Sequence, residues 1–217
     1  MTKYILKFAK GERVKYVSHL DIVRVFSRTL RRAEIAVSHS QGFNPHPLMT
    51  FAHPLGVGIA SNAELMELSL DEDLTPKELA LRMNDAFPPG FKVYAAKKCL
   101  GKSPFSGLRY AEYQMKISGV FPEGIRPLAE AETLILPKRS KSGVKDTDIK
   151  PFIKELTVMK ETPEQIELKA VLKCGNENLK PELLVQAILT FAGAQVKDYD
   201  VVRTRLLDQE VQELVGF

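Results

Sequence analysis

The feature that most constrains the fold is an order of periodic segments that occurs twice along the 217 residues. In the first half, segments in which apolar and charged side chains alternate are separated by segments with the apolar spacing of a helix. Alternation predicts a half-buried strand, and a repeat of roughly 3.6 residues predicts an amphipathic helix. This half predicts strands at 3–9, 34–38, 64–69 and 91–99, with helices at 18–33 and 75–87.

The second half repeats this order after a polar linker at 100–107 and ends in a peripheral tail. It predicts strands at 108–118, 134–138, 149–159, 165–173 and 196–207, with helices at 123–133 and 181–192. The order strand, helix, strand, strand, helix, strand is typical of a ferredoxin-like domain, in which two helices back an antiparallel sheet. We therefore predict an α+β protein with two tandem ferredoxin-like (βαββαβ) domains, at 1–100 and 108–217. The second domain contains a basic hairpin at 138–150.

A proline- and glycine-rich loop interrupts the first predicted domain at 38–62. Its central stretch, SHSQGFNPHPLMTFAHPLGVG, contains three prolines and three of the four histidines of the chain. So many prolines argue against a central strand, and the stretch has no helical period. Its apolar residues, such as Phe43 and Leu55, predict that the loop is anchored on a core. A long, anchored loop of this kind is a usual place for a binding or catalytic site.

Composition indicates an ordinary globular protein, with 44% apolar and 27% charged residues. No apolar run approaches the roughly 18 residues of a membrane-spanning helix. The N-terminal sequence lacks the apolar centre of a signal peptide. Cys99 and Cys174 lie far apart, which argues against a disulfide framework or a cysteine metal cluster. We expect a cytoplasmic protein without membrane contact.

Positive charge is concentrated at the start of the chain. Residues 1–60 contain nine Lys or Arg and three Asp or Glu, which gives +6, so the remainder of the +4 chain sums to −2. A basic segment that also holds all four histidines predicts an anionic partner. The alternative is a basic face that is only solvated.

The helix predicted at 18–33 carries the clearest nucleic-acid signal, because four arginines recur at helical spacing away from its apolar face. Guanidinium groups bind phosphates through paired hydrogen bonds, and aromatic rings stack bases. The predicted RNA-binding residues are Arg24, Arg28, Arg31 and Arg32 in the helix, Gln41, Phe43, Asn44 and His46 in the loop, and Lys138, Arg139 and Lys141 in the hairpin.

His19 and Asp21 are the candidate catalytic residues. His19 lies in the first turn of the predicted helix, where the helix dipole favours the neutral imidazole. A neutral imidazole near arginines can act as a general base on an anionic substrate. The structural alternatives are a His19 that bonds the following loop and an Asp21 that caps the helix or pairs with an arginine. Even spacing of the loop histidines does not make ligands converge, so we predict no metal and no cofactor.

Four motifs stand out: SHLD at 18–21, SQGFNPHP at 40–47, PLGVG at 54–58 and, more weakly, DIKPFI at 148–153. Through them the chain closely resembles the radical SAM-linked protein family, a bacterial domain of unknown function. The resemblance implies a radical SAM protein encoded beside this chain or fused to it, often one with a cobalamin-binding domain. This chain is not itself that enzyme, whose iron–sulfur cluster needs three clustered cysteines.

We expect an RNA-binding accessory protein that acts with a radical SAM enzyme in tRNA or rRNA modification. Two alternatives stay open. The first is a metal-independent RNA-processing enzyme that uses His19 as its base. The second is a docking partner of the radical SAM protein that binds no RNA.

Overall fold

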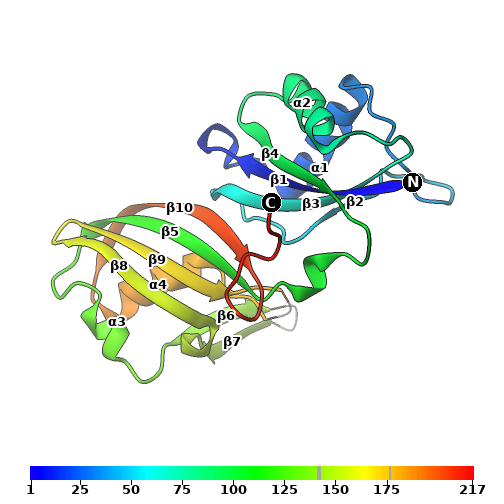
Figure 1. Cartoon of the computed structure of the whole chain (residues 1–217). Helices are drawn as coiled ribbons and strands as arrows, with labels where there is room; N and C mark the ends of the chain where they lie inside the picture. Colours follow the sequence, from blue (N-terminus) through cyan, green and yellow to red (C-terminus); the bar gives the residue numbers. More distant parts are fainter. Residues whose placement is uncertain (141–142, 176) are drawn as a thin grey trace. The chain divides into compact units, whose positions relative to one another are not determined.

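The computed structural model describes residues 1–140, 143–175 and 177–217, except for the side chains of Arg139 and Ser140. The chain divides into two compact units (Figure 1). Unit 1 comprises Met1–Leu108 together with Asp208–Phe217, and unit 2 comprises Arg109–Leu207. The final ten residues, which the sequence places after the second half as a peripheral tail, therefore belong with unit 1.

Unit 1 is an antiparallel sheet with two α-helices. Its elements are β1 (Thr2–Lys10), η1 (Glu12–Val14), α1 (His19–Arg32), β2 (Met49–Phe51), β3 (Ala60–Leu70), α2 (Pro76–Ala86), β4 (Phe91–Lys98) and η2 (Pro104–Gly107). The strand order is β4-β1-β3-β2, and each neighbouring pair is antiparallel. β2 lies inside the long loop and forms a three-residue edge on β3.

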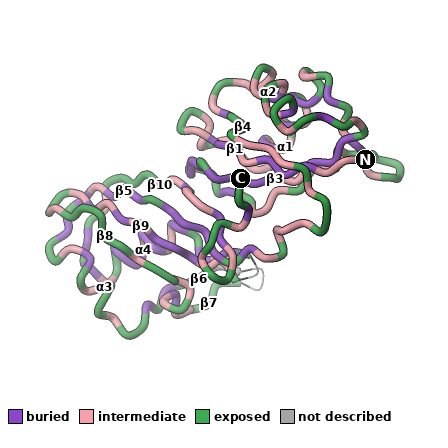
Figure 2. Tube along the Cα trace, viewed as in Figure 1, coloured by how far each residue is buried: buried purple, intermediate pink, exposed green. Residues whose placement is uncertain are grey.

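The helix α1 begins where the sequence supplies an N-cap. The Ser18 side chain accepts a hydrogen bond from the Asp21 backbone N–H at 3.3 Å, which satisfies one of the unpaired donors of the first turn. The inward face of α1 packs into the core of unit 1, where buried segments follow the strands and the inner sides of the helices (Figure 2). Phe26 is fully buried at the centre of an aromatic cluster. The rings that contact it belong to Phe8, Phe51, Phe87 and Phe91.

The C-terminal segment 208–217 is attached to unit 1 by side-chain and main-chain contacts. The Glu213 carboxylate lies 3.5 Å from the ammonium of Lys7. Lys97 donates a hydrogen bond to the Gly216 carbonyl at 2.7 Å, and its ammonium lies 5.3 Å from the centroid of the Phe217 ring. Val215 is buried. These contacts explain why the tail is not peripheral.

Unit 2 is also an antiparallel sheet, with one short and one full-length helix. Its elements are β5 (Tyr110–Val120), α3 (Arg126–Glu130), β6 (Ile135–Ser140), β7 (Gly143–Asp148), η3 (Lys150–Phe152), β8 (Ile153–Thr162), β9 (Gln165–Lys173), α4 (Pro181–Phe191) and β10 (Gln195–Leu207). The strand order is β10-β5-β9-β8, again with antiparallel neighbours. β6 and β7 pair only with each other and form a separate two-stranded hairpin.

The predicted α+β class with antiparallel sheets is confirmed. The strand predicted at 34–38 is wrong, because this segment forms only an isolated bridge between Val37 and Leu70. Glu34 has a φ of 52°, so the chain makes a left-handed turn directly after α1. The strand next to β3 instead comes from Met49–Phe51, which the prolines on both sides had hidden.

Candidate nucleic-acid interface

One face of α1 presents arginines to solvent. Arg24, Arg28 and Arg31 are all exposed, and their i, i+4, i+7 spacing places them on one side of the helix. Arg24 forms an ion pair with the Asp21 carboxylate at 2.7 Å. Within the described parts of the chain, the side chains of Arg28 and Arg31 have no hydrogen-bonding or ion-pair partner. We call these three residues the α1 arginine surface.

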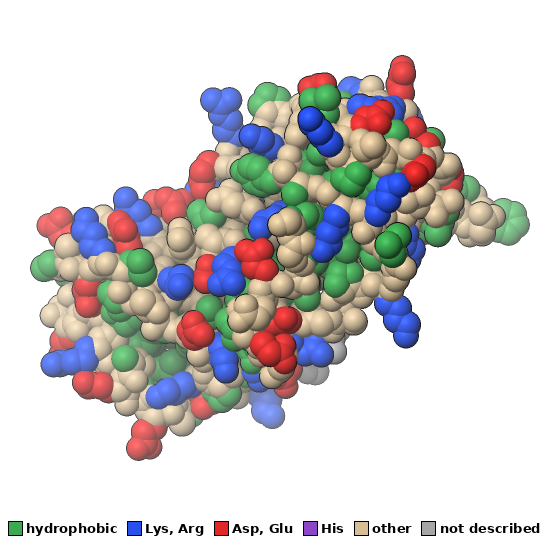
Figure 3. Space-filling model, viewed as in Figure 1, with side chains coloured by type: hydrophobic (Ala, Val, Ile, Leu, Met, Phe, Trp, Pro, Cys, Tyr) green, Lys and Arg blue, Asp and Glu red, His purple; other side chains and the backbone are tan. Residues whose placement is uncertain are grey.

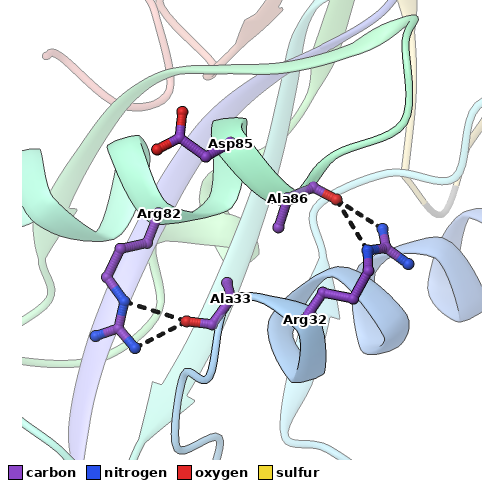
Figure 4. A pocket seen from close by; sticks show the side chains of 5 residues that line it. All are labelled: Arg32, Ala33, Arg82, Asp85 and Ala86. Carbon is purple, nitrogen blue, oxygen red and sulfur yellow. Dashed lines mark hydrogen bonds between the residues drawn. The ribbon is translucent and has the colours of Figure 1, made fainter.

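Arg32 differs from the other three because its guanidinium binds a neighbouring helix. Its Nη2 and Nε donate to the carbonyl of Ala86, the last residue of α2, at 2.7 and 3.1 Å (Figure 4). The last carbonyls of a helix lack intrahelical partners, so this contact satisfies one of them. The sequence grouped Arg32 with the other three, and only its position at the end of α1 separates it.

An arginine of α2 likewise binds main-chain carbonyls at the end of α1. Arg82 donates to the Ala33 carbonyl at 2.8 Å and to the Glu34 carbonyl at 2.6 Å, directly beyond the end of α1. Arg32 and Arg82 line a pocket of about 450 Å³ together with Ala33, Asp85 and Ala86. Figure 4 shows these five residues. Both guanidiniums in this pocket are thus committed to main-chain carbonyls. Sequence reasoning missed Arg82, for which the helical pattern gave no signal.

His19 is placed against the core rather than in an open site. It is the first residue of α1 and is half-buried. Its ring meets the Phe51 ring edge-on, with centroids 5.2 Å apart and an interplanar angle of 85°. Phe51 belongs to the loop that follows α1, so His19 packs on that loop, in keeping with the structural alternative. His19 remains partly exposed.

Asp21 acts as a capping residue in the first turn of α1. Its carboxylate accepts hydrogen bonds from the Ser18 hydroxyl and from Arg24, both at 2.7 Å. These two contacts, the Ser18 hydrogen bond first, hold the pKa of Asp21 below its usual value. A carboxylate stabilised as an anion is a weaker base, so Asp21 fits proton transfer poorly.

The SQGFNPHP motif folds into a hairpin that displays its tip. His39 and Pro47 form a bridge at its base. The Ser40 N–H donates to the His46 carbonyl at 2.9 Å, and the Ser40 hydroxyl lies 2.8 Å from His46 Nδ1. The tip between them is exposed, and Phe43, which the sequence predicts to anchor the loop on a core, is fully exposed there instead. The tip also contains Gln41 and Asn44.

The histidines do not form a metal-binding group within the described part of the chain. Among the described residues, no three His, Cys, Asp or Glu side chains are arranged so that they could hold a metal ion. His46 bonds within the hairpin, whereas His19 contacts Phe51. His19 and His46 therefore make separate contacts with different partners.

The basic hairpin of unit 2 turns one of its lysines inward. The Lys138 ammonium lies 3.9 Å from the centroid of the Phe152 ring, and that of Lys173 lies 5.3 Å from the same centroid. Burial lowers the pKa of Lys138. Lys138 also pairs across the hairpin with Lys145. Lys141 and the Arg139 side chain fall outside the described residues.

The face of the molecule in Figure 3 carries cations and carboxylates side by side rather than in separate patches. Within the part of the chain that the structure describes, no helix is long and apolar enough to cross a membrane.

A family model described as an uncharacterized protein conserved in bacteria (DUF2344) matches residues 3–181. The chain belongs to this family. No curated protein matches the sequence. The family description names no radical SAM protein, so that part of the resemblance remains a prediction.

Solved structures give a fold-level likeness. A chain in the crystal structure of a Cbf5-Nop10-Gar1 complex aligns with a TM-score of 0.51 and 9% identity, covering 94% of this chain and 48% of that chain. A chain in the structure of an H/ACA RNP bound to a substrate RNA containing 2'-deoxyuridine has a TM-score of 0.49 and 10% identity, covering 94% and 47%. This chain therefore spans about half the length of these solved chains. At such identities the first likeness shows a related fold.

Proposed function

We propose that this protein binds RNA through the α1 arginine surface. The observation that carries the proposal is that Arg24, Arg28 and Arg31 point away from the core on one helix face. Two of them have no partner among the described side and main chains, so their guanidiniums remain available. Guanidinium groups fork onto phosphate oxygens, and a row at helical spacing follows a phosphate backbone.

The SQGFNPHP hairpin supplies a second kind of contact. Phe43 is fully exposed at its tip, where contact of an apolar ring with water is unfavourable. Aromatic side chains stack on bases regardless of sequence, and amides such as those of Gln41 and Asn44 bond base edges. Lys138 is not part of the proposed surface, because its ammonium lies on the Phe152 ring.

We further propose that each unit is a ferredoxin-like domain. In support, the order β4-β1-β3-β2 in unit 1 corresponds to β10-β5-β9-β8 in unit 2. In each unit, one helix follows the first strand and another precedes the last. The likeness to the chain in the Cbf5-Nop10-Gar1 complex is one of fold and carries no part of the functional proposal.

The biological setting we propose comes from the family resemblance. The protein is an accessory of a radical SAM enzyme in the modification of tRNA or rRNA, in the cytoplasm. Its own chain then holds the RNA, and the partner performs the chemistry.

The direct test is RNA affinity as a function of salt. Arg24→Ala with Arg28→Ala should weaken binding on the order of tenfold and reduce the salt slope by roughly one for each lost phosphate contact. Fluorescence anisotropy with labelled RNA measures both quantities. A control variant, Lys77→Ala with Arg126→Ala, removes two exposed cations outside α1 and should leave affinity nearly unchanged.

Equal losses of RNA affinity in the two double variants would contradict the proposal that the α1 arginine surface is the binding face. Crosslinking and sequencing of RNA bound to the tagged protein in its own cells then names the RNA. Recovery of the radical SAM protein with no enriched RNA would favour the docking role instead.

A further inference from the structure

Three exposed apolar side chains lie where the PLGVG motif meets the start of α1. Tyr16, Leu20 and Val57 are 72%, 69% and 56% exposed. Tyr16 precedes α1, Leu20 is in its first turn, and Val57 is in the loop. We call them the Tyr16 platform. Exposed apolar side chains that form a contiguous patch are typical of a binding surface.

The backbone beneath the platform joins the two segments directly. The Gly58 N–H donates a hydrogen bond to the Lys15 carbonyl at 2.9 Å. A Cβ on Gly58 would lie 3.8 Å from Cε1 of Tyr16, so the ring lies along this loop. Gly58 has a φ of +86°, which only glycine adopts readily. The loop conformation therefore depends on the last glycine of the motif.

A buried lysine, Lys10, binds both the segment before α1 and the PLGVG loop. Lys10, at the end of β1, is fully buried, although the sequence pattern ended the strand before it. Its ammonium donates to the Lys15 carbonyl at 2.7 Å and to the Gly56 carbonyl at 3.4 Å. Burying an ammonium is costly unless its hydrogen bonds are made. The buried Lys10 therefore holds the loop at Gly56 next to the segment that carries the exposed Tyr16.

One cation lies beside Tyr16, and the arginines of α1 follow Leu20 along the helix. The Lys15 ammonium, which pairs with Glu12 at 3.0 Å, lies 5.7 Å from the centroid of the Tyr16 ring. Arg24 follows Leu20 by four residues on the same side of α1, and Arg28 follows by four more. An exposed ring beside a row of cations is the arrangement that binds single-stranded nucleic acid, with bases on rings and phosphates on cations.

We propose that Tyr16 stacks on an unpaired base of single-stranded RNA whose backbone continues along Arg24 and Arg28. This inference rests on the proposed RNA-binding function and adds the kind of RNA bound. In a duplex the base faces are already stacked, so the platform discriminates against paired RNA. It also gives the PLGVG motif a role, which is to hold Tyr16 in place.

The experiment compares a labelled single-stranded oligoribonucleotide with a duplex of the same sequence. Tyr16→Ala should weaken binding of the single strand about 5- to 150-fold, the range expected for loss of one base–aromatic stack. The salt slope should stay unchanged, because no phosphate contact is lost. Tyr16→Phe keeps the ring and should bind as the native protein does.

A matched control exists in the same unit. Tyr94 in β4 is 52% exposed, and the Lys92 ammonium lies 5.5 Å from the centroid of its ring. Tyr94→Ala removes an equivalent ring away from the α1 arginine surface and should leave affinity unchanged. The melting temperature of each variant shows that the fold is retained.

The outcomes separate this inference from the function it rests on. If Arg24→Ala with Arg28→Ala weakens binding while Tyr16→Ala does not, the protein binds RNA but the platform is wrong. If the native protein prefers the duplex, the platform is wrong as well. If the native protein binds neither RNA, both proposals fall.

Discussion

Unit 1 and unit 2 share a strand order but use their basic residues differently. In unit 1, α1 is a capped helix of 14 residues whose arginines point outward. In unit 2 the equivalent helix, α3, has five residues, and the basic hairpin β6–β7 follows it. There Lys138 turns onto Phe152. One topology therefore supports an outward cationic surface in one unit and an inward cation–ring contact in the other.

The largest expected effect comes from a second difference between the units, which is the burial of their cysteines, Cys99 in unit 1 and Cys174 in unit 2. Burial raises the pKa of the Cys174 thiol from 9.0 to about 12. At about pH 8 that rise lowers its thiolate fraction about 1000-fold, so Cys174 should react with iodoacetamide much more slowly than an ordinary thiol. Cys99, at the end of β4, is partly exposed and should react first. Mass spectrometry of the alkylated peptides measures both rates, and equal rates would contradict the buried environment of Cys174.

The raised pKa of Cys174 also makes the stability of the fold depend on pH. Because the native pKa of Cys174 is raised, the native state favours the neutral thiol. Its contribution to stability is complete below the unfolded pKa and is lost as pH rises toward about 12. Cys174→Ser should therefore flatten the loss of stability at alkaline pH.

The second comparison concerns the helices. Phe26→Ala in α1 should cost about 3–5 kcal/mol of unfolding free energy, because it empties the centre of the aromatic cluster. Leu128→Ala in α3 should cost about 2–3 kcal/mol, because a short helix can relax around the smaller cavity. Urea denaturation gives both values. A larger loss for Leu128 would mean that the short helix is packed as tightly as α1.

The third comparison separates arginines with different roles within unit 1. Arg82→Ala should cost about 2 kcal/mol, since it leaves the carbonyls of Ala33 and Glu34 without a charged donor. Arg28→Ala should change stability by less than about 0.5 kcal/mol, because that side chain is exposed. Similar losses for both would indicate that the α1 arginine surface stabilises the fold rather than binding RNA.

The smallest expected effect belongs to the hairpin. Lys138→Met keeps the apolar stem on Phe152 and removes the charge, so RNA affinity should change by less than about twofold. Anisotropy under the conditions used for the arginine variants provides the comparison. A loss as large as that of the α1 double variant would place the hairpin in the binding surface after all.

The site was only partly predictable for reasons of geometry. Helical spacing correctly placed Arg24, Arg28 and Arg31 on one exposed face, because the period is a local property of the backbone. It could not separate Arg32, whose partner is the end of another helix 54 residues later in the chain. Lys10 and Tyr16 escaped notice for the same reason, since Gly56 and Gly58 reach them only after the long loop returns.

The sequence by itself determined the elements whose causes are local. It specified alternating strands, the spacing of the arginines on one face of α1 and the twice-repeated element order, because side-chain period acts over a few neighbouring residues. Tertiary structure alone decided that β2 lies within the loop, that 208–217 joins unit 1, and that Lys138 faces inward. Those outcomes depend on burial and hydrogen bonding between residues far apart in the chain, which no local pattern encodes.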